Sequence, residues 1–137
     1  MTGVSFKGIL LGVLATAALD AVGGIFIAIL FVAGHPRSAM TPQEANAAAT
    51  AMLLRPAPLV VSLVVGLLTD TVGGYVAARV AKKAPYVNAG VIGALCIVIG
   101  AATAHRYPLW FDIVSFLLVM PASLLGGHLA RPRIGEA

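Results

Sequence analysis

The chain has 137 residues, of which 60% are hydrophobic and only 10% are charged, against roughly 25% charged residues in an ordinary soluble domain. This composition excludes a disordered chain, and nine Lys and Arg with five Asp and Glu are too few to cover a soluble globule of this size. The net charge of +4 sits in small clusters between apolar runs, which is typical of membrane topology rather than of a nucleic-acid footprint. The sequence therefore predicts an all-α integral membrane protein that binds no nucleic acid.

Four apolar segments predict four transmembrane helices, which we expect to form an antiparallel bundle in a single domain. The segments cover about residues 9–34, 59–78, 87–104 and 109–130 of a domain that spans 1–137. At about 1.5 Å rise per residue, each is long enough to cross a hydrocarbon layer of about 30 Å.

The connection between the first two segments predicts a fifth, shorter helix. Thr41 is a good N-cap, Pro42 suits the first helical position, and Glu44 completes a capping box. An Ala-rich stretch follows, so we expect a helix over about 42–54 on the outer membrane surface. It is either a plain connector, or a lid or docking surface.

The basic residues predict the orientation of the chain in the membrane. Cytoplasmic loops carry an excess of Lys and Arg, and six basic residues fall on one side of the predicted spans against three on the other. We therefore expect a multi-pass protein of the bacterial inner membrane with both termini in the cytoplasm. The six are Lys7, Arg79, Lys82, Lys83, Arg131 and Arg133, and the three are Arg37, Arg55 and Arg106.

Small residues recur at every fourth position in the first two segments. Residues four apart share a helix face, and small residues on one face let two membrane helices approach closely. We therefore expect the first two segments to pack face to face along these rows. The rows are Gly8, Gly12, Thr16, Asp20, Gly24 and Ala28, and then Ser62, Gly66, Asp70, Gly74 and Ala78; the predicted packing residues are Gly8, Gly12, Gly24, Gly66 and Gly74.

Each of these rows contains one aspartate. Asp20 lies 13 residues after Lys7 and Asp70 lies 12 residues before Lys82, so both carboxyls are expected near the bilayer midplane at similar heights. Two carboxyls close together in a low dielectric do not ionise together, so we expect at least one to be protonated at neutral pH. The pair either binds a proton, a metal cation or a cationic substrate, or it links helices or meets a basic residue of another subunit.

The remaining polar residues predict no chemistry. Asp112 falls in the first turn of the fourth segment, where we expect an outer-interface ion pair with Arg106. The single Cys96 is interpreted as a small buried hydrophobe. Metal-ligand spacings and catalytic motifs are missing from the sequence, so we expect no enzyme, no catalytic residue, no metal site and no cofactor.

The run over 73–83, Gly-Gly-Tyr-Val-Ala-Ala-Arg-Val-Ala-Lys-Lys, and the run over 88–93, Asn-Ala-Gly-Val-Ile-Gly, carry a resemblance to known proteins. The chain resembles a broad family of small bacterial four-span inner-membrane proteins of unknown function. The resemblance implies a four-helix inner-membrane architecture and carries over no catalytic residue. Other residues that match the family are Asp20, Gly23, Gly24, Pro42 and Glu44.

These patterns favour a non-enzymatic protein that acts as an oligomeric or accessory subunit of a membrane complex. Its expected partners are the lipid bilayer, and either further copies of itself or a larger membrane complex. The alternative is a small proton- or cation-coupled transporter that uses Asp20 and Asp70. Its size and the acid in its first span are similar to those of the small multidrug resistance proteins, although it lacks their aromatic-lined pocket around that acid. A third hypothesis is a lipid-binding or membrane-shaping protein.

Overall fold

The computed structural model describes residues 3–34, 40–82 and 84–131, and within these ranges it contains five α-helices, one short 3-10 turn and no β-strand. Four of the helices are long and apolar enough to cross a membrane, which confirms the predicted all-helical fold with four candidate spans. The helices are α1 (Phe6–Val32), α2 (Pro42–Leu53), α3 (Pro56–Ala81), α4 (Pro85–Thr103) and α5 (Leu109–Leu129), and the 3-10 turn is Ala104–Arg106.

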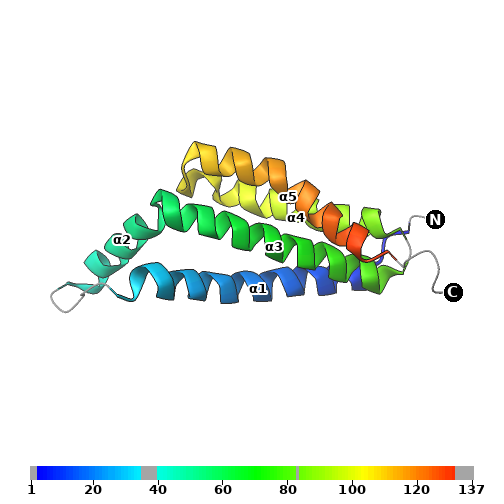
Figure 1. Cartoon of the computed structure of the whole chain (residues 1–137), viewed down its shortest axis with the longest axis horizontal. Coiled ribbons are helices and arrows are strands. Elements are labelled where there is room, and N and C mark those ends of the chain that lie inside the picture. Colours follow the sequence, from blue (N-terminus) through cyan, green and yellow to red (C-terminus); the bar gives the residue numbers. More distant parts are fainter. Residues whose placement is uncertain (1–2, 35–39, 83, 132–137) are drawn as a thin grey trace.

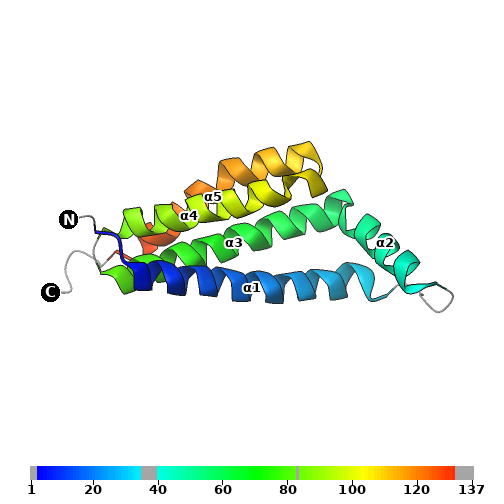
Figure 2. The same ribbon diagram turned by 180° about the vertical axis from the view of Figure 1, so that it is seen from behind.

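The four long helices lie side by side along the longest axis of the molecule, and α2 lies obliquely across one end (Figures 1 and 2). The central helix, α3, packs against α1, α4 and α5. The helices are closest where α1 begins and where α3 and α5 end, which we call the narrow end. They diverge toward α2, which we call the wide end (Figure 1).

Several helices begin at a proline, because a first-turn N–H has no partner within the helix and its loss costs little. Pro42, Pro56 and Pro85 occupy this position in α2, α3 and α4. The helix α3 extends beyond the apolar segment predicted for it at both ends, because hydropathy marks only the apolar part of a helix whose hydrogen bonding continues into polar residues. It ends at Lys82, which has the left-handed φ of 57°.

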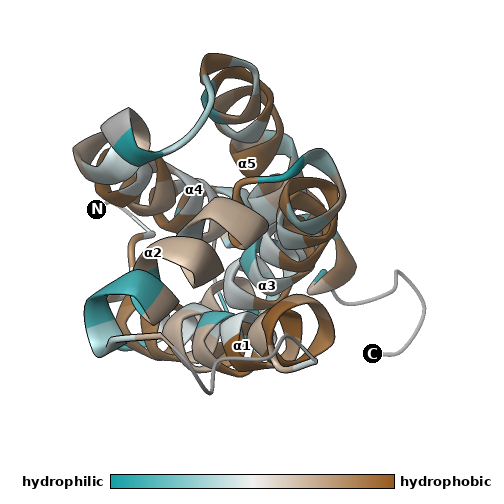
Figure 3. Ribbon diagram, turned by 90° about the vertical axis from the view of Figure 1, so that its left-hand side faces the viewer, coloured by the Kyte–Doolittle hydropathy of each residue, from teal (hydrophilic) through white to brown (hydrophobic). Residues whose placement is uncertain are grey.

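Large apolar side chains cover much of the outside of the bundle. Phe6 and Leu109 are among the most exposed, and all four long helices carry exposed Val, Ile or Leu residues. Seen from the wide end, the outward faces of the long helices are mostly hydrophobic (Figure 3). The buried hydrophobic residues, by contrast, are few and include four alanines. This distribution suits a protein surrounded by lipid, since a soluble protein rarely exposes such a large apolar surface.

Glycines set the contact between α1 and α3 at the narrow end. A Cβ atom at Gly8 would lie 2.7 Å from the carbonyl oxygen of Ala77, and one at Gly12 would lie 2.8 Å from that of Gly73. Farther along α1, a Cβ at Gly23 would lie 2.5 Å from the Val65 side chain. As residue numbers rise along α1, those of the contacts on α3 therefore fall. Gly8 and Gly12 pack against α3, as their spacing predicts.

The other three predicted packing glycines do not take the expected role. Gly74 faces α5, where a Cβ would collide with the backbone of Ser123, while its neighbour Gly73 faces α1. Adjacent residues point about 100° apart on a helix, and α3 has a helix on each of these faces. Gly24 and Gly66 have no atom within 4 Å of a built Cβ, because neither faces the other helix; their neighbours Gly23 and Val65 make that contact instead. The predicted row on α3 is thus wrong by one residue, and the contact between α1 and α3 continues past Asp20 to Gly23 and Val65.

A buried asparagine holds the start of α1 against α4. Asn88 is fully buried, and its Oδ1 accepts a hydrogen bond of 2.8 Å from the backbone N–H of Ser5. Its Nδ2 donates to the carbonyl oxygens of Gly3, at 2.9 Å, and Ala84, at 3.1 Å. The side chain therefore links two segments that lie more than 80 residues apart in the sequence.

The capping box at the start of α2 is present. The backbone N–H and the hydroxyl of Thr41 both donate to Oε2 of Glu44 at 2.8 Å, and the Glu44 N–H donates to the Thr41 hydroxyl at 3.4 Å. These reciprocal bonds satisfy N–H groups that have no partner within the helix.

The titration of Glu44 tests this cap. The backbone N–H of Thr41 and then its hydroxyl hold the pKa of Glu44 below its ordinary value, because both donate to the charged carboxylate. The stabilisation of α2 by the cap is therefore complete above the ordinary pKa of glutamate and is lost as the pH falls through the lowered pKa. Thr41→Ala removes the hydroxyl and keeps the backbone N–H, so we expect it to raise the Glu44 pKa part of the way toward its ordinary value, measured by a 13C NMR titration of the Glu44 carboxyl. Gln43→Ala is the control and should leave the Glu44 pKa unchanged. A Glu44 pKa in Thr41→Ala equal to that of the wild type would contradict the bond from the Thr41 hydroxyl.

Candidate functional site

A cleft of about 400 Å³ lies between the narrow and wide ends and is lined by all four long helices. Most of its wall is apolar, and a few polar side chains converge on it, which is the usual character of a small-molecule site. The apolar wall includes Leu63, Ile92 and Phe111. The polar side chains are Thr16 and Asp20 from α1, Ser62 and Asp70 from α3, Cys96 from α4 and Ser115 from α5.

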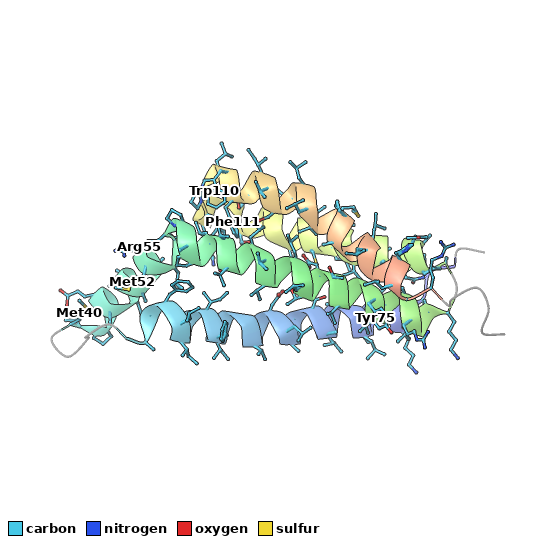
Figure 4. All side chains as sticks on the ribbon, in the orientation of Figure 1. Met40, Met52, Arg55, Tyr75, Trp110 and Phe111 are labelled. Carbon is cyan, nitrogen blue, oxygen red and sulfur yellow. The ribbon has the colours of Figure 1, made fainter. Side chains whose placement is uncertain are left out.

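The mouth of the cleft lies between α1 and α4. The lining residues Asp20 on α1 and Ile99 on α4 are exposed, whereas those on α3 and α5 are buried or half-buried. Contacts between α1 and α4 are also sparse compared with those that α3 makes. Trp110 and Phe111 lie at the start of α5, at the wide end (Figure 4). A ligand can thus reach the cleft from the side of the bundle, between α1 and α4, where the two helices cover it least.

Asp20 lies at this mouth and is hydrogen-bonded to α3. Its Oδ1 accepts a bond of 2.5 Å from the hydroxyl of Thr69, and the same hydroxyl lies 2.8 Å from the carbonyl oxygen of Gly66. A hydroxyl has one hydrogen and two lone pairs. Thr69 can therefore donate to an ionised Asp20, or accept from a protonated Asp20 while donating to Gly66. The contact serves both protonation states of the carboxyl.

Asp70 lies deeper in the same cleft and is buried, with 7% of its surface exposed. Its carboxyl is hydrogen-bonded to the Cys96 thiol, and it is close enough to Asp20 for the two to interact electrostatically. Among the residues that the structure describes, no Lys or Arg lines the cleft. The two carboxyls therefore line one mostly apolar space, Asp70 buried in it and Asp20 at its mouth.

The cleft brings together some of the sequence-predicted site residues and leaves others apart. Asp20 and Asp70 face the same space, and Gly66 lines it as well. The predicted ion pair between Asp112 and Arg106 is not formed in the described part of the chain. Arg106 is exposed in the 3-10 turn, before the Pro108 that precedes α5, and an exposed pair gains little free energy by closing.

Sequence reasoning missed three features of the site. Cys96, interpreted as an inert hydrophobe, contacts the Asp70 carboxyl, and Ser62 and Ser115 contribute hydroxyl groups to the wall. In the sequence, the signal for these residues is that each is a polar side chain within an apolar run. Spacing within a single helix does not show that such residues from different helices share one cavity. Among the described residues, no group of three or more His, Cys, Asp or Glu side chains is placed to hold a metal ion.

Comparisons of the chain with protein-family models, with curated proteins and with solved structures give no match. The function is therefore inferred from the geometry of the cleft.

Proposed function

We propose that the protein is a small non-enzymatic membrane transporter that binds a lipophilic cation in exchange for a proton carried by Asp20 and Asp70. The observation that carries this proposal is that both carboxyls line one mostly apolar cleft, in whose wall the described part of the chain places no basic side chain. Apolar walls favour the organic part of such a cation, and the carboxyls favour its charge.

In this proposal the four long helices span a bacterial inner membrane as an antiparallel bundle, with α2 on the outer surface. The narrow end faces the cytoplasm, because Lys7, Arg79, Lys82 and Arg131 lie at that end, as the positive-inside rule requires. Both termini are then cytoplasmic, and the chain is one of the small four-span proteins that it resembles.

The exchange uses the hydrogen bonds around Asp20. With the cleft empty, the carboxyl pair holds a proton, and the Thr69 hydroxyl donates to Gly66. When a cation enters between α1 and α4, the proton leaves and the hydroxyl turns to the ionised Asp20. Because the mouth faces sideways, the cation enters from the lipid and brings its apolar groups against residues such as Leu95 and Ile99.

Binding of tetraphenylphosphonium to the purified protein in detergent tests this proposal. We expect binding to tighten as the pH rises and to release protons into a weakly buffered solution. Asp20→Asn and Asp70→Asn should each weaken binding at least about tenfold, or about 1.4 kcal/mol, and reduce the proton release.

Asp112→Asn is the matched control, because it removes a carboxyl that does not line the cleft. It should leave both binding and proton release as in the wild type. Equal binding by all three variants, or binding without any dependence on pH, would overturn the proposal. Uptake of the same cation into proteoliposomes under a pH gradient then separates transport from binding alone.

A second candidate is the oligomeric or accessory subunit, and the exposed Gly24 favours it. This glycine shares a face of α1 with Asp20 and Ala28 and has no atom within 4 Å of a built Cβ, and small residues are where membrane helices approach one another. Native mass spectrometry in a mild detergent tests this role. An assembly larger than one chain that Gly24→Leu dissociates would support it, and a single chain in the wild type would contradict it.

A further inference from the structure

A second cavity, of about 300 Å³, lies at the narrow end, away from the cleft. Its lining combines two basic residues at the end of α3, Arg79 and Lys82, with the first residue of α4, Pro85. Ala78 and Ala130 also line it, and both are buried. The cavity thus has an apolar floor and a basic rim.

Its two cations have no carboxylate partner among the residues that the structure describes. Asp20 and Asp70 line the cleft, Glu44 is in α2 and Asp112 is at the start of α5. No hydrogen bond or ion pair joins Arg79 or Lys82 to another described side chain. The start of α4 brings the positive end of one helix dipole to the cavity and the ends of α3 and α5 bring negative ends, so the positive field there comes from the two side chains. The cavity therefore attracts an anion of a size that a phosphate group fits.

An apolar groove of about 380 Å³ lies farther along the same two helices, between α3 and α5. On α3, a series of residues spaced three or four apart runs from this groove to the basic cavity. Residues at this spacing lie on one face of the helix. On α5 the same spacing leads from the groove to Leu129, the neighbour of the cavity residue Ala130. The α3 residues are Val64, Leu68, Thr71, Tyr75, Ala78 and Lys82, and the α5 residues are Leu118, Ala122, Leu125 and Leu129.

We infer that the basic cavity binds the phosphate of an anionic phospholipid and that the α3–α5 groove holds one of its acyl chains. The phosphate provides the negative partner that Arg79 and Lys82 lack among the described residues. The guanidinium of Arg79 presents a planar set of donors that suits phosphate oxygens. The acyl chain covers apolar side chains on the outside of the bundle, including the exposed Leu125 and Leu129. Basic pockets beside transmembrane helices on the cytoplasmic side are suited to such headgroups. This inference does not depend on the function of the cleft.

Native mass spectrometry of the full chain, released from nanodiscs with equal amounts of phosphatidylglycerol and phosphatidylcholine, tests the inference. We expect the wild type to retain phosphatidylglycerol in preference. Each basic residue near a membrane surface contributes a fewfold effect, so Arg79→Gln should reduce retention about fivefold and Arg79→Gln with Lys82→Gln at least about tenfold. Lys7→Gln removes a positive charge at the same end, outside the cavity, and should leave retention unchanged.

One further variant and one further probe separate the sources of the phosphate. Ala122→Phe fills the groove without changing any charge, and it should also reduce lipid retention. If inorganic phosphate binds the lipid-free protein as tightly as phosphatidylglycerol and Ala122→Phe has no effect, the site takes free phosphate and the lipid inference is wrong. An equal loss in Lys7→Gln would overturn it too, since retention would then follow overall charge alone.

Discussion

The substitution Gly74→Val is expected to separate α3 from α5 and to prevent the bundle from folding. A Cβ at this position would collide with the carbonyl oxygen of Ser123 and would lie 2.9 Å and 3.0 Å from its carbonyl carbon and Cα. All three atoms are backbone, so a rotamer change cannot relieve the collision. A Cβ at Gly126 would likewise collide with the backbone of Thr71, about one turn away at the same crossing of α3 and α5. Overpacking usually costs about 1–3 kcal/mol, and we expect Gly74→Val to exceed that range because two backbones must move apart.

Gly66→Val is the matched control on the same helix. A Cβ at Gly66 has no atom within 4 Å, and the helix propensities of Gly and Val differ by only a few tenths of a kcal/mol. Thermal unfolding in detergent, followed by circular dichroism, should therefore rank the proteins with Gly66→Val close to wild type, Gly74→Ala well below it and Gly74→Val lowest or unfolded. Equal melting temperatures for Gly66→Val and Gly74→Val would contradict the backbone contact between α3 and α5.

The substitution Asn88→Ala is expected to release the start of α1 from α4 and to destabilise the chain by about 3 kcal/mol, or more than a hundredfold in the folding equilibrium. It removes the acceptor for the Ser5 N–H and the donor to the carbonyl groups of Gly3 and Ala84. Burial of a polar group without its hydrogen bond costs about 1–3 kcal/mol, so the loss of several such bonds adds to the lost packing.

Hydrogen exchange measured by mass spectrometry should locate this effect. We expect faster exchange in residues 3–10 and at the start of α4, together with a lower melting temperature. Asn46→Ala is the control, because Asn46 is exposed on α2 and its side chain makes no contact of this kind among the described residues. If exchange near Ser5 is the same in Asn88→Ala and in wild type, the asparagine is not what holds the N-terminal segment in place.

The features that local sequence decides could be predicted. Four apolar runs are long enough to be spans, and the Thr41–Glu44 capping box needs only residues three apart. The partner of each glycine could not be predicted in the same way. In the pair Gly73 and Gly74, both residues are small and adjacent, and only the position of α5 determines that one faces α1 and the other faces α5.

Only part of the site could be predicted from the sequence, because some of its residues are unusual in an apolar run and others are not. Two acids within apolar runs are unusual, so Asp20 and Asp70 attract attention without any structure. Cys96 and Asn88 do not, because a cysteine in an apolar run is ordinary and an asparagine at the start of a span looks like part of a loop. Their roles depend on contacts with Asp70 and with Ser5, which lie 26 and 83 residues away in the chain.

The closest backbone contacts between α1 and α3 lie at the narrow end, at Gly8 and Gly12. Gly12 touches the backbone of α3, and Val32 at the other end of the helix lies 20 residues, or about 30 Å, farther along. If α1 tilts by about 5° around Gly12, Val32 at its far end moves by about 3 Å, given the helical rise of about 1.5 Å per residue. At Asp20, eight residues or about 12 Å from Gly12, the same tilt moves α1 by about 1 Å, so the wide end of α1 shifts farther than the mouth of the cleft does.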